Sequence, residues 1–174
     1  MIPVFPAQYI CWMSALSEQA EKVSLIAIGN STMADDGIAL LLLEHIKEQL
    51  PEHIKYYFWD NQDALTIAAD LLEINTPVII IDCADMGLKA GEFRWFKGSE
   101  CQLQNHFNLL STHGFSFTEA LALVEQLGFN QPLYFFAIQP ACIELNQPVS
   151  RLLYKNIPKM SQELLKQLQT YSVY

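Results

Sequence analysis

The sequence is poor in basic residues, because only 10 lysines and arginines stand against 19 aspartates and glutamates in 174 residues. Proteins that bind nucleic acids neutralise phosphates with clustered lysine and arginine, and ten scattered basic residues form no such stripe. The formal net charge of −9 instead favours neutral, basic or cationic partners, metal ions included. We therefore expect no nucleic-acid partner.

Long apolar runs are also missing. A membrane-spanning helix needs about 18 consecutive apolar residues, and no such stretch occurs, so we expect no membrane association. Glycine and proline, with 7 and 8 residues, are too few for a collagen-like chain. Hydrophobic residues make up 51% of the sequence, which is ample for a core, and a length of 174 residues predicts one domain at roughly 150 residues per domain.

The cysteines form no Cys-x-x-Cys pair, which excludes a zinc knuckle and a thioredoxin-type motif. The four are Cys11, Cys83, Cys101 and Cys142. Widely spaced cysteines in an apolar chain are most simply buried free thiols, and a cytoplasmic protein is therefore expected.

The first 22 residues differ from the rest of the chain. They contain no basic residue before Lys22, whereas a secretory signal begins with a basic region. Pro3 and Pro6 also interrupt their apolar run. We expect residues 1–22 to form an N-terminal extension and residues 23–174 to form the domain.

The remaining sequence alternates between strand-like and helix-like segments. Short apolar or β-branched runs predict strands at residues 24–28, 54–59, 78–81, 91–96 and 133–138. Leucine-rich or capped segments predict helices at residues 37–50, 64–74, 116–127 and 149–170. Pro158 either kinks the last helix or starts another. This order predicts an α/β fold whose mostly parallel sheet has helices on both faces, with the strand at 91–96 antiparallel.

Polar residues follow the predicted parallel strands, where ligands bind in open sheets of this kind. Asp35 and Asp36 follow the first strand, and either of them could cap the next helix. Asp82 follows four β-branched residues, where a carboxylate is costly to desolvate unless something pairs with it. His113 precedes the third predicted helix. Two carboxylates and an imidazole suit a divalent metal with open coordination positions, whereas a turn residue and a backbone-bonded histidine are the plainer alternatives.

Several familiar motifs are absent from the sequence. It contains no Gly-x-Gly-x-x-Gly fingerprint and no phosphate loop, which argues against a dinucleotide or nucleoside triphosphate. It also lacks Gly-x-Ser-x-Gly and His-Glu-x-x-His, the signatures of common hydrolases. Ser111 lies two residues from His113, which gives poor control of a nucleophile and its base.

Four segments of the sequence resemble the hydrogenase maturation proteases, which process the large subunit of nickel–iron hydrogenases. These segments are Ile28-Gly29-Asn30 with Asp35-Asp36-Gly37, Ile81-Asp82-Cys83-Ala84 with Gly87 and Gly91, Ser111-Thr112-His113-Gly114 with residues 117–121, and residues 136–140 with Val149-Ser150. They occur in the family's order from about residue 24 to the C-terminus. The resemblance implies a three-layer α/β/α sandwich with a five-stranded, mostly parallel sheet and one antiparallel strand.

The resemblance also implies an activity and a site. The family removes a C-terminal extension from the large-subunit precursor after nickel insertion, and it has no conventional protease nucleophile. Its nickel-contacting residues correspond to Asp36, Asp82 and His113, with the nickel supplied by the substrate and other divalent cations able to occupy the site in crystals. Asp60 is the nearest match to an aspartate that precedes a glycine-rich turn in many members, and its loop is expected to govern substrate choice.

Two other functions stay open at this point. The first is a non-catalytic protein that binds a metal ion or the hydrogenase precursor. The second is a different hydrolase of the same fold class, such as a peptidyl-tRNA hydrolase. The net charge of −9 counts against the second, because that enzyme would need a basic face.

Overall fold

The computed structural model of the chain describes residues 22–101, 108–109 and 117–170. Five strands form its sheet in the order β2-β1-β3-β6-β4. Their bounds are Val23–Gly29 for β1, Ile54–Asp60 for β2, Val78–Asp85 for β3, Phe93–Lys97 for β4 and Leu133–Ile138 for β6. The first three and β6 run parallel, and β4 runs antiparallel to β6. A two-residue strand, β5 at Asn108–Leu109, pairs antiparallel with the end of β3.

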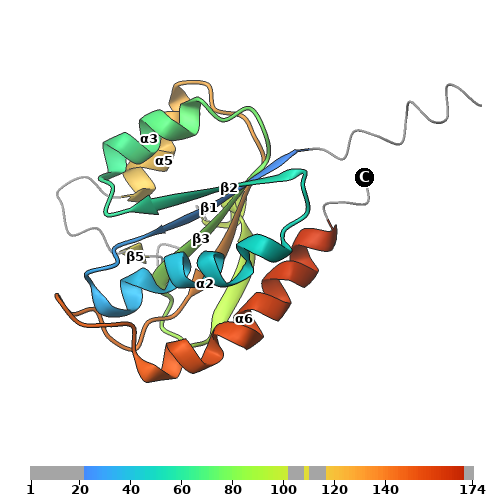
Figure 1. Ribbon diagram of the computed structural model, residues 1–174. Helices are drawn as coiled ribbons and strands as arrows, with labels where there is room; N and C mark the ends of the chain where they lie inside the picture. The colour runs from blue at the N-terminus through green and yellow to red at the C-terminus, as the bar shows by residue number, and fades with distance from the viewer. Residues whose placement is uncertain (1–21, 102–107, 110–116, 171–174) are drawn as a thin grey trace, which may run out of the picture.

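Helices cover both faces of this sheet (Figure 1). On one face lie α2 at Ile38–Ile46 and α6 at Arg151–Thr170, and on the other lie α3 at Ala64–Leu72 and α5 at Phe117–Gln126. The shorter elements are the 3-10 helices η1 at Ala34–Gly37 and η2 at Lys47–Gln49 and the single turn α4 at Gly98–Cys101. The expected three-layer α/β/α sandwich with one antiparallel strand in its five-stranded sheet is confirmed.

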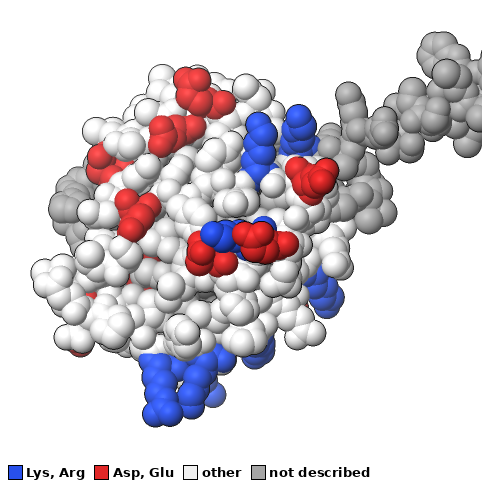
Figure 2. Space-filling model, in the orientation of Figure 1, with Lys and Arg blue, Asp and Glu red and all other residues white. Residues whose placement is uncertain are grey.

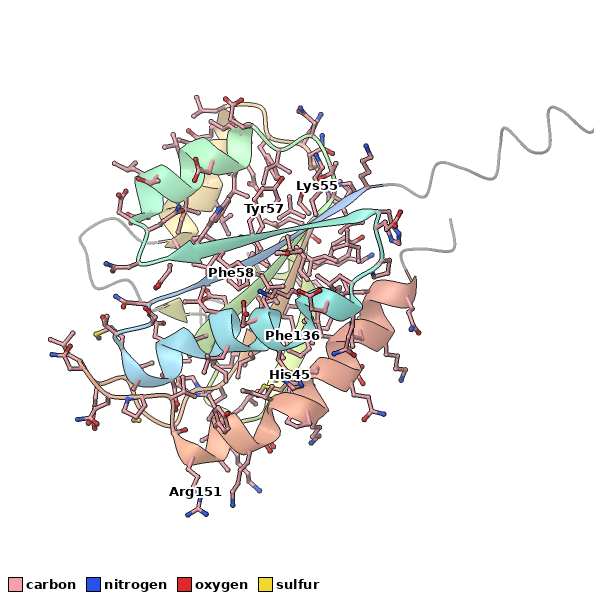
Figure 3. The ribbon with its side chains drawn as sticks, in the orientation of Figure 1. His45, Lys55, Tyr57, Phe58, Phe136 and Arg151 are labelled. Carbon is pink, nitrogen blue, oxygen red and sulfur yellow. The ribbon has the colours of Figure 1, made fainter. Side chains whose placement is uncertain are left out.

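The alternating side chains of β3 divide the core into two halves. Ile79 and Ile81 pack with α2 and α6, whereas Val78 and Ile80 pack with α3 and α5. Every β3 residue before the last is buried, as expected for a parallel strand covered on both faces. Phe136 of β6, labelled in Figure 3, belongs to the half formed with α2 and α6.

The end of β3 differs from the sequence-based expectation. Each predicted strand and helix is present, but β3 continues to Asp85, so Asp82 lies inside the strand and not at its end. Two strands stabilise this extension of β3. The strand β6 pairs with it as far as Cys83, and β5 pairs with Ala84 and Asp85. Neither interaction is visible in the short β-branched run itself.

The last helix is a single element. It begins at Arg151, slightly later than predicted, and continues through Pro158, so the prediction that this proline starts a second helix is wrong. A proline leaves the carbonyl four residues earlier without its helical partner, but here that carbonyl belongs to the exposed Tyr154, where water can reach it. Ile157 and Met160 on either side are buried and hold the helix against the sheet.

Some predictions fall outside the described residues. Residues 1–21 of the expected N-terminal extension belong to this group, as do Cys11 and the side chain of Cys101. The two described cysteines, the buried Cys83 and the half-buried Cys142, are free thiols as expected. Within the described ranges, every helix is too short or too polar to cross a bilayer.

Candidate functional site

The loop after β1 folds back onto the strand that precedes it. β1 ends at Gly29, and η1 brings the backbone of Asp36 so close that a Cβ at Gly29 would overlap the Asp36 carbonyl oxygen. The Asp36 carbonyl belongs to the backbone, so it cannot move away as the end of a flexible side chain can. The backbone of Asn30 also hydrogen-bonds the Asp36 carboxylate. Glycine followed by asparagine therefore positions Asp36 against the end of the sheet.

We expect Gly29→Ala to lower the free energy of unfolding by about 1–3 kcal/mol, because the added methyl group displaces the Asp36 backbone. Urea unfolding measures the loss. Gly87→Ala is the control, because a Cβ at Gly87 meets open space and only the positive φ of 65° opposes it. A Gly29→Ala protein as stable as the wild type would show that the loop tolerates displacement.

Asp35 has a structural role that its neighbour lacks. Its side chain is completely buried, and its Oδ2 accepts the N–H groups of Ala141 and Cys142 at 2.8 and 3.1 Å. Its Oδ1 accepts the N–H of Ser150 at 2.6 Å. Asp35 therefore ties η1 to the backbone just ahead of α6, while the adjacent Asp36 is only partly buried. Both residues were candidates for a helix cap, but neither side chain caps η1 or α2.

The carboxyl group of Asp36 in η1 acts on the ionisation of Asp82 in β3. Burial and, after it, the charge of Asp36 together raise the pKa of Asp82 to about 8, against the opposing effect of the Cys83 N–H at 2.7 Å. Burial likewise raises the pKa of Asp36 to about 6. Ile81 pairs with Ala27, so Asp82 lies at the level where β1 ends. The structure thus brings these two carboxyl groups into one electrostatic environment.

Asp60 closes the other side of this region. It is the last residue of β2, and its carboxylate accepts the N–H and the hydroxyl of Ser31 at 2.8 and 2.7 Å. Next to it, the side chain of Asn30 donates to that of Asn61 at 2.8 Å. The charge of Asp60 also raises the pKa of Asp36. The loop expected to govern substrate choice is therefore bonded directly to the loop that carries Asp36.

His113 lies outside the described residues, so its side chain is not located. The described parts of the chain on either side of it lie beside β3 and its neighbour β6. Leu109 of β5 pairs with Ala84 of β3, and Phe117 at the start of α5 packs its ring edge-on against Phe135, with centroids 6.3 Å apart. Among the described residues, no three histidine, cysteine or acidic side chains form a ready metal-binding group.

Gln139 is a buried polar residue that the sequence analysis missed. Its Oε1 accepts the N–H groups of Met86 and Leu88 at 2.7 and 3.1 Å, and its Nε2 donates to Asp85 at 3.1 Å. That hydrogen bond holds the pKa of Asp85 below its usual range. Gln139 therefore fastens the loop after β3 to the end of β6. A glutamine directly after an apolar strand was the signal available in the sequence.

The paired carboxyl groups define what the site can do. Two acids that share a low-dielectric region resist ionising together, and a cation between them removes the repulsion. Carboxylate oxygens are suitable ligands for divalent ions, and strongly raised pKa values concentrate at functional sites. Asp36 and Asp82 therefore fit a divalent cation, and between pH 6 and 8 they can also exchange protons.

Comparison with known families identifies the family of the chain. A sequence profile of the family described as hydrogenase maturation protease matches residues 63–167, more than half of the chain. The chain belongs to the hydrogenase maturation protease family. That membership implies a peptidase, which is a hydrolase. The matched range contains Asp82 and His113, whereas Asp36 and Asp60 precede it.

Solved structures share the fold of this hydrogenase maturation protease. An endopeptidase from Escherichia coli superposes with a TM-score of 0.72 at 16% identity, over 86% of this chain and 93% of the other. The NiFe hydrogenase maturation protease HybD from Thermococcus kodakarensis gives 0.65 at 23% identity, over 84% and 99%. The E. coli hydrogenase maturating endopeptidase HybD gives 0.67 at 15% identity, over 86% and 93%. No curated protein sequence matches the chain.

Proposed function

We propose that the chain removes the C-terminal extension of a nickel–iron hydrogenase large-subunit precursor after nickel has been inserted. The observation that carries the proposal is the pair formed by Asp36 and Asp82, whose pKa values are raised mainly by burial. In this proposal the nickel arrives with the substrate, and Asp36, Asp82 and His113 bind it. The family of the chain supports peptide hydrolysis as the reaction.

The described residues around His113 support its inclusion in this set. Leu109 pairs with Ala84, two residues beyond Asp82. The four residues from Leu109 to His113 span at most about 14 Å, even when fully extended. On the other side, Phe117 contacts β6, the strand next to β3. The chain on one side of His113 therefore lies beside β3, which carries Asp82, and the chain on the other side lies beside the neighbouring strand β6.

Recognition of the cation makes cleavage conditional on nickel loading. A precursor without nickel offers no cation to Asp36 and Asp82, so it binds poorly. When bound, nickel would supply Lewis acidity that polarises the scissile carbonyl or activates a water. Burial raises the pKa of Asp36 to about 6 in the ligand-free chain, so at neutral pH it offers a carboxylate to the cation. Asp60 is assigned to substrate choice, because its carboxylate holds the loop that positions Asp36.

We expect His113→Ala to abolish processing of the nickel-loaded precursor, because one of three nickel contacts is lost. Cleavage is followed by the mobility shift of the large subunit on a gel. His45→Ala is the matched control, because His45 is an exposed residue of α2 and should leave cleavage unchanged (Figure 3). Full activity of His113→Ala would remove His113 from the site.

The same assay separates the enzyme from a binding protein. Loss of a C-terminal peptide from the nickel-loaded precursor supports the endopeptidase. A stable complex that forms without release of any peptide would instead support the non-catalytic precursor-binding function.

A further inference from the structure

Basic residues, scarce in the chain as a whole, concentrate in its last helix. Residues 151–174 contain four of the ten basic residues and one of the 19 acidic residues, a formal charge of +3. Residues 1–150 contain the other six basic and 18 acidic residues, a formal charge of −12. The basic residues were treated as scattered in the sequence analysis, and this is wrong for α6, which carries all four basic residues of this segment.

The four basic residues of α6 share one exposed face. Arg151, Lys155, Lys159 and Lys166 fall within an arc of about 80° and extend over about 22 Å of helix at 100° and 1.5 Å per residue. We call these four residues the basic stripe. The opposite face of α6 packs into the core through Leu153, Ile157, Met160, Leu164 and Leu168. Basic side chains project along the lower edge of the molecule in Figure 2, where α6 lies in Figure 1, and Arg151 points away from the body in Figure 3.

The charges of the basic stripe are not neutralised by the part of the chain that the structure describes, where none of the four forms an ion pair. Glu163, the one acidic residue of α6, accepts a hydrogen bond from Gln167 at 2.9 Å. Lys159 lies over the ring of Phe93, 5.6 Å from its centroid, which holds its stem against β4. Like charges four residues apart destabilise a helix, so helix stability does not account for the stripe.

The basic stripe begins beside the candidate site. Ser150, the residue directly ahead of α6, donates its N–H to Asp35, and Asp35 adjoins Asp36. Leu152 and Tyr154 in the first turn are 48% and 62% exposed and add apolar surface next to the first cation of the stripe. A folded partner that presents a peptide bond to Asp36 therefore extends over the first turns of α6.

We propose that the basic stripe docks an acidic surface of the hydrogenase large-subunit precursor beside the segment that is cleaved. This inference rests on the proposed function and names the chemistry of its partner. The site end of the protein is acidic through Asp36, Asp60 and Asp82, whereas α6 is basic. A partner that carries a metal cation next to an acidic face matches both regions in one orientation only. Such complementarity speeds encounter and fixes the register of the complex.

The test compares the wild type with the triple variant Arg151→Glu/Lys155→Glu/Lys159→Glu. The probe is a nickel-loaded large-subunit precursor, in separate binding and cleavage assays at low salt. We expect about a tenfold or greater loss in affinity and in kcat/KM, with kcat unchanged, because the substituted side chains touch the partner and not the reacting bond. The difference should shrink at about 1 M salt, where the Debye length is near 3 Å.

A charge-matched control removes the general effect of net charge. Lys22→Glu/Lys55→Glu/Lys97→Glu also takes the formal net charge from −9 to −15. Lys22 and Lys55 lie at the amino ends of β1 and β2, and Lys97 pairs with Tyr134 near the amino end of β6, so all three are at the end of the sheet opposite the site. Thermal melting of both variants verifies that each is folded.

Each outcome has a distinct meaning. Equal losses in the two triple variants, or no loss in the stripe variant, would overturn the docking proposal. If the wild type binds the precursor without cleaving it, and charge reversal of the stripe abolishes that binding, the docking proposal stands and the proposed peptidase function is rejected. Failure of the wild type to bind the precursor at all would overturn both. If the wild type sediments with phosphatidylglycerol vesicles and the stripe variant does not, while both bind the precursor equally, the stripe binds a membrane and the docking proposal is overturned.

Discussion

Replacing Asp35 with alanine lowers the free energy of unfolding by about 3–5 kcal/mol, because a completely buried carboxylate is lost and three backbone donors lose their acceptor together. The donors are the backbone N–H groups of Ala141, Cys142 and Ser150, at 2.6 to 3.1 Å from the carboxylate. A fully buried amide left unpaired costs about 1–3 kcal/mol, and these three part-buried amides recover part of that sum through water and local rearrangement. Urea unfolding at pH 7 measures the effect.

The neighbouring residue is the matched control for this experiment. Asp36→Asn should be neutral or slightly stabilising at pH 7, because burial raises the pKa of Asp36 to about 6 and its ionised form is disfavoured. The stability of Asp35→Asn should lie between those of Asp35→Ala and Asp36→Asn, since one amide oxygen replaces two carboxylate oxygens. Similar losses at both positions would contradict the division of roles between Asp35 and Asp36.

Replacing Asp82 with asparagine raises the stability of the ligand-free protein at alkaline pH and abolishes cleavage. The pKa of Asp82 rises from 3.8 in the unfolded chain to about 8 in the fold, so the folded protein binds a proton that the unfolded chain releases. The resulting stabilisation is complete below about pH 4 and is lost as the pH rises to about 8. Asparagine never ionises, and we expect a gain of about 2–4 kcal/mol over the wild type at pH 8.5.

Chemical unfolding at pH 5 and pH 8.5 tests this prediction. The wild type should lose stability between the two values, and the raised pKa of Asp36 adds to the loss in the lower part of the range. The Asp82→Asn protein should change much less. Asp85→Asn, three residues along β3, is the control and should show no gain, because hydrogen bonds from Gln139 and Gly87 lower the pKa of Asp85. A pH-independent wild type, or an Asp82→Asn protein that still cleaves, would contradict the account.

Most of the fold could be predicted because its strands and helices have distinct local patterns. The unbroken run at residues 78–81 predicts a strand covered on both faces, and the structure shows that strand in the middle of the sheet. The two-residue β5 could not be predicted, because so short a strand has no periodicity. Its pairing with Ala84 and Asp85 depends on residues far away in the sequence, and so does the extension of β3 past Asp82.

The roles of individual site residues were harder to predict. Asp35 and Asp36 are chemically alike and adjacent, and the difference between them comes from amide donors more than a hundred residues away, such as Ala141. No local pattern contains that information. The basic stripe, in contrast, was visible in the sequence, because Arg151, Lys155 and Lys159 recur at the four-residue spacing of one helix face. Counting basic residues over the whole chain concealed it.

The arrangement of Asp35 and Asp36 has a consequence for changes in the length of the loop between β1 and η1. The N–H groups of Ala141, Cys142 and Ser150, here called the amide cradle, donate to the side chain that stands six residues after Gly29, so the length of this loop matters as much as its composition. Deleting one residue between Gly29 and Asp35 would deliver Asp36 to the cradle and leave Gly37 facing the site. Such a deletion would therefore turn the carboxylate of the site into a structural one and leave the site without an acid at this position.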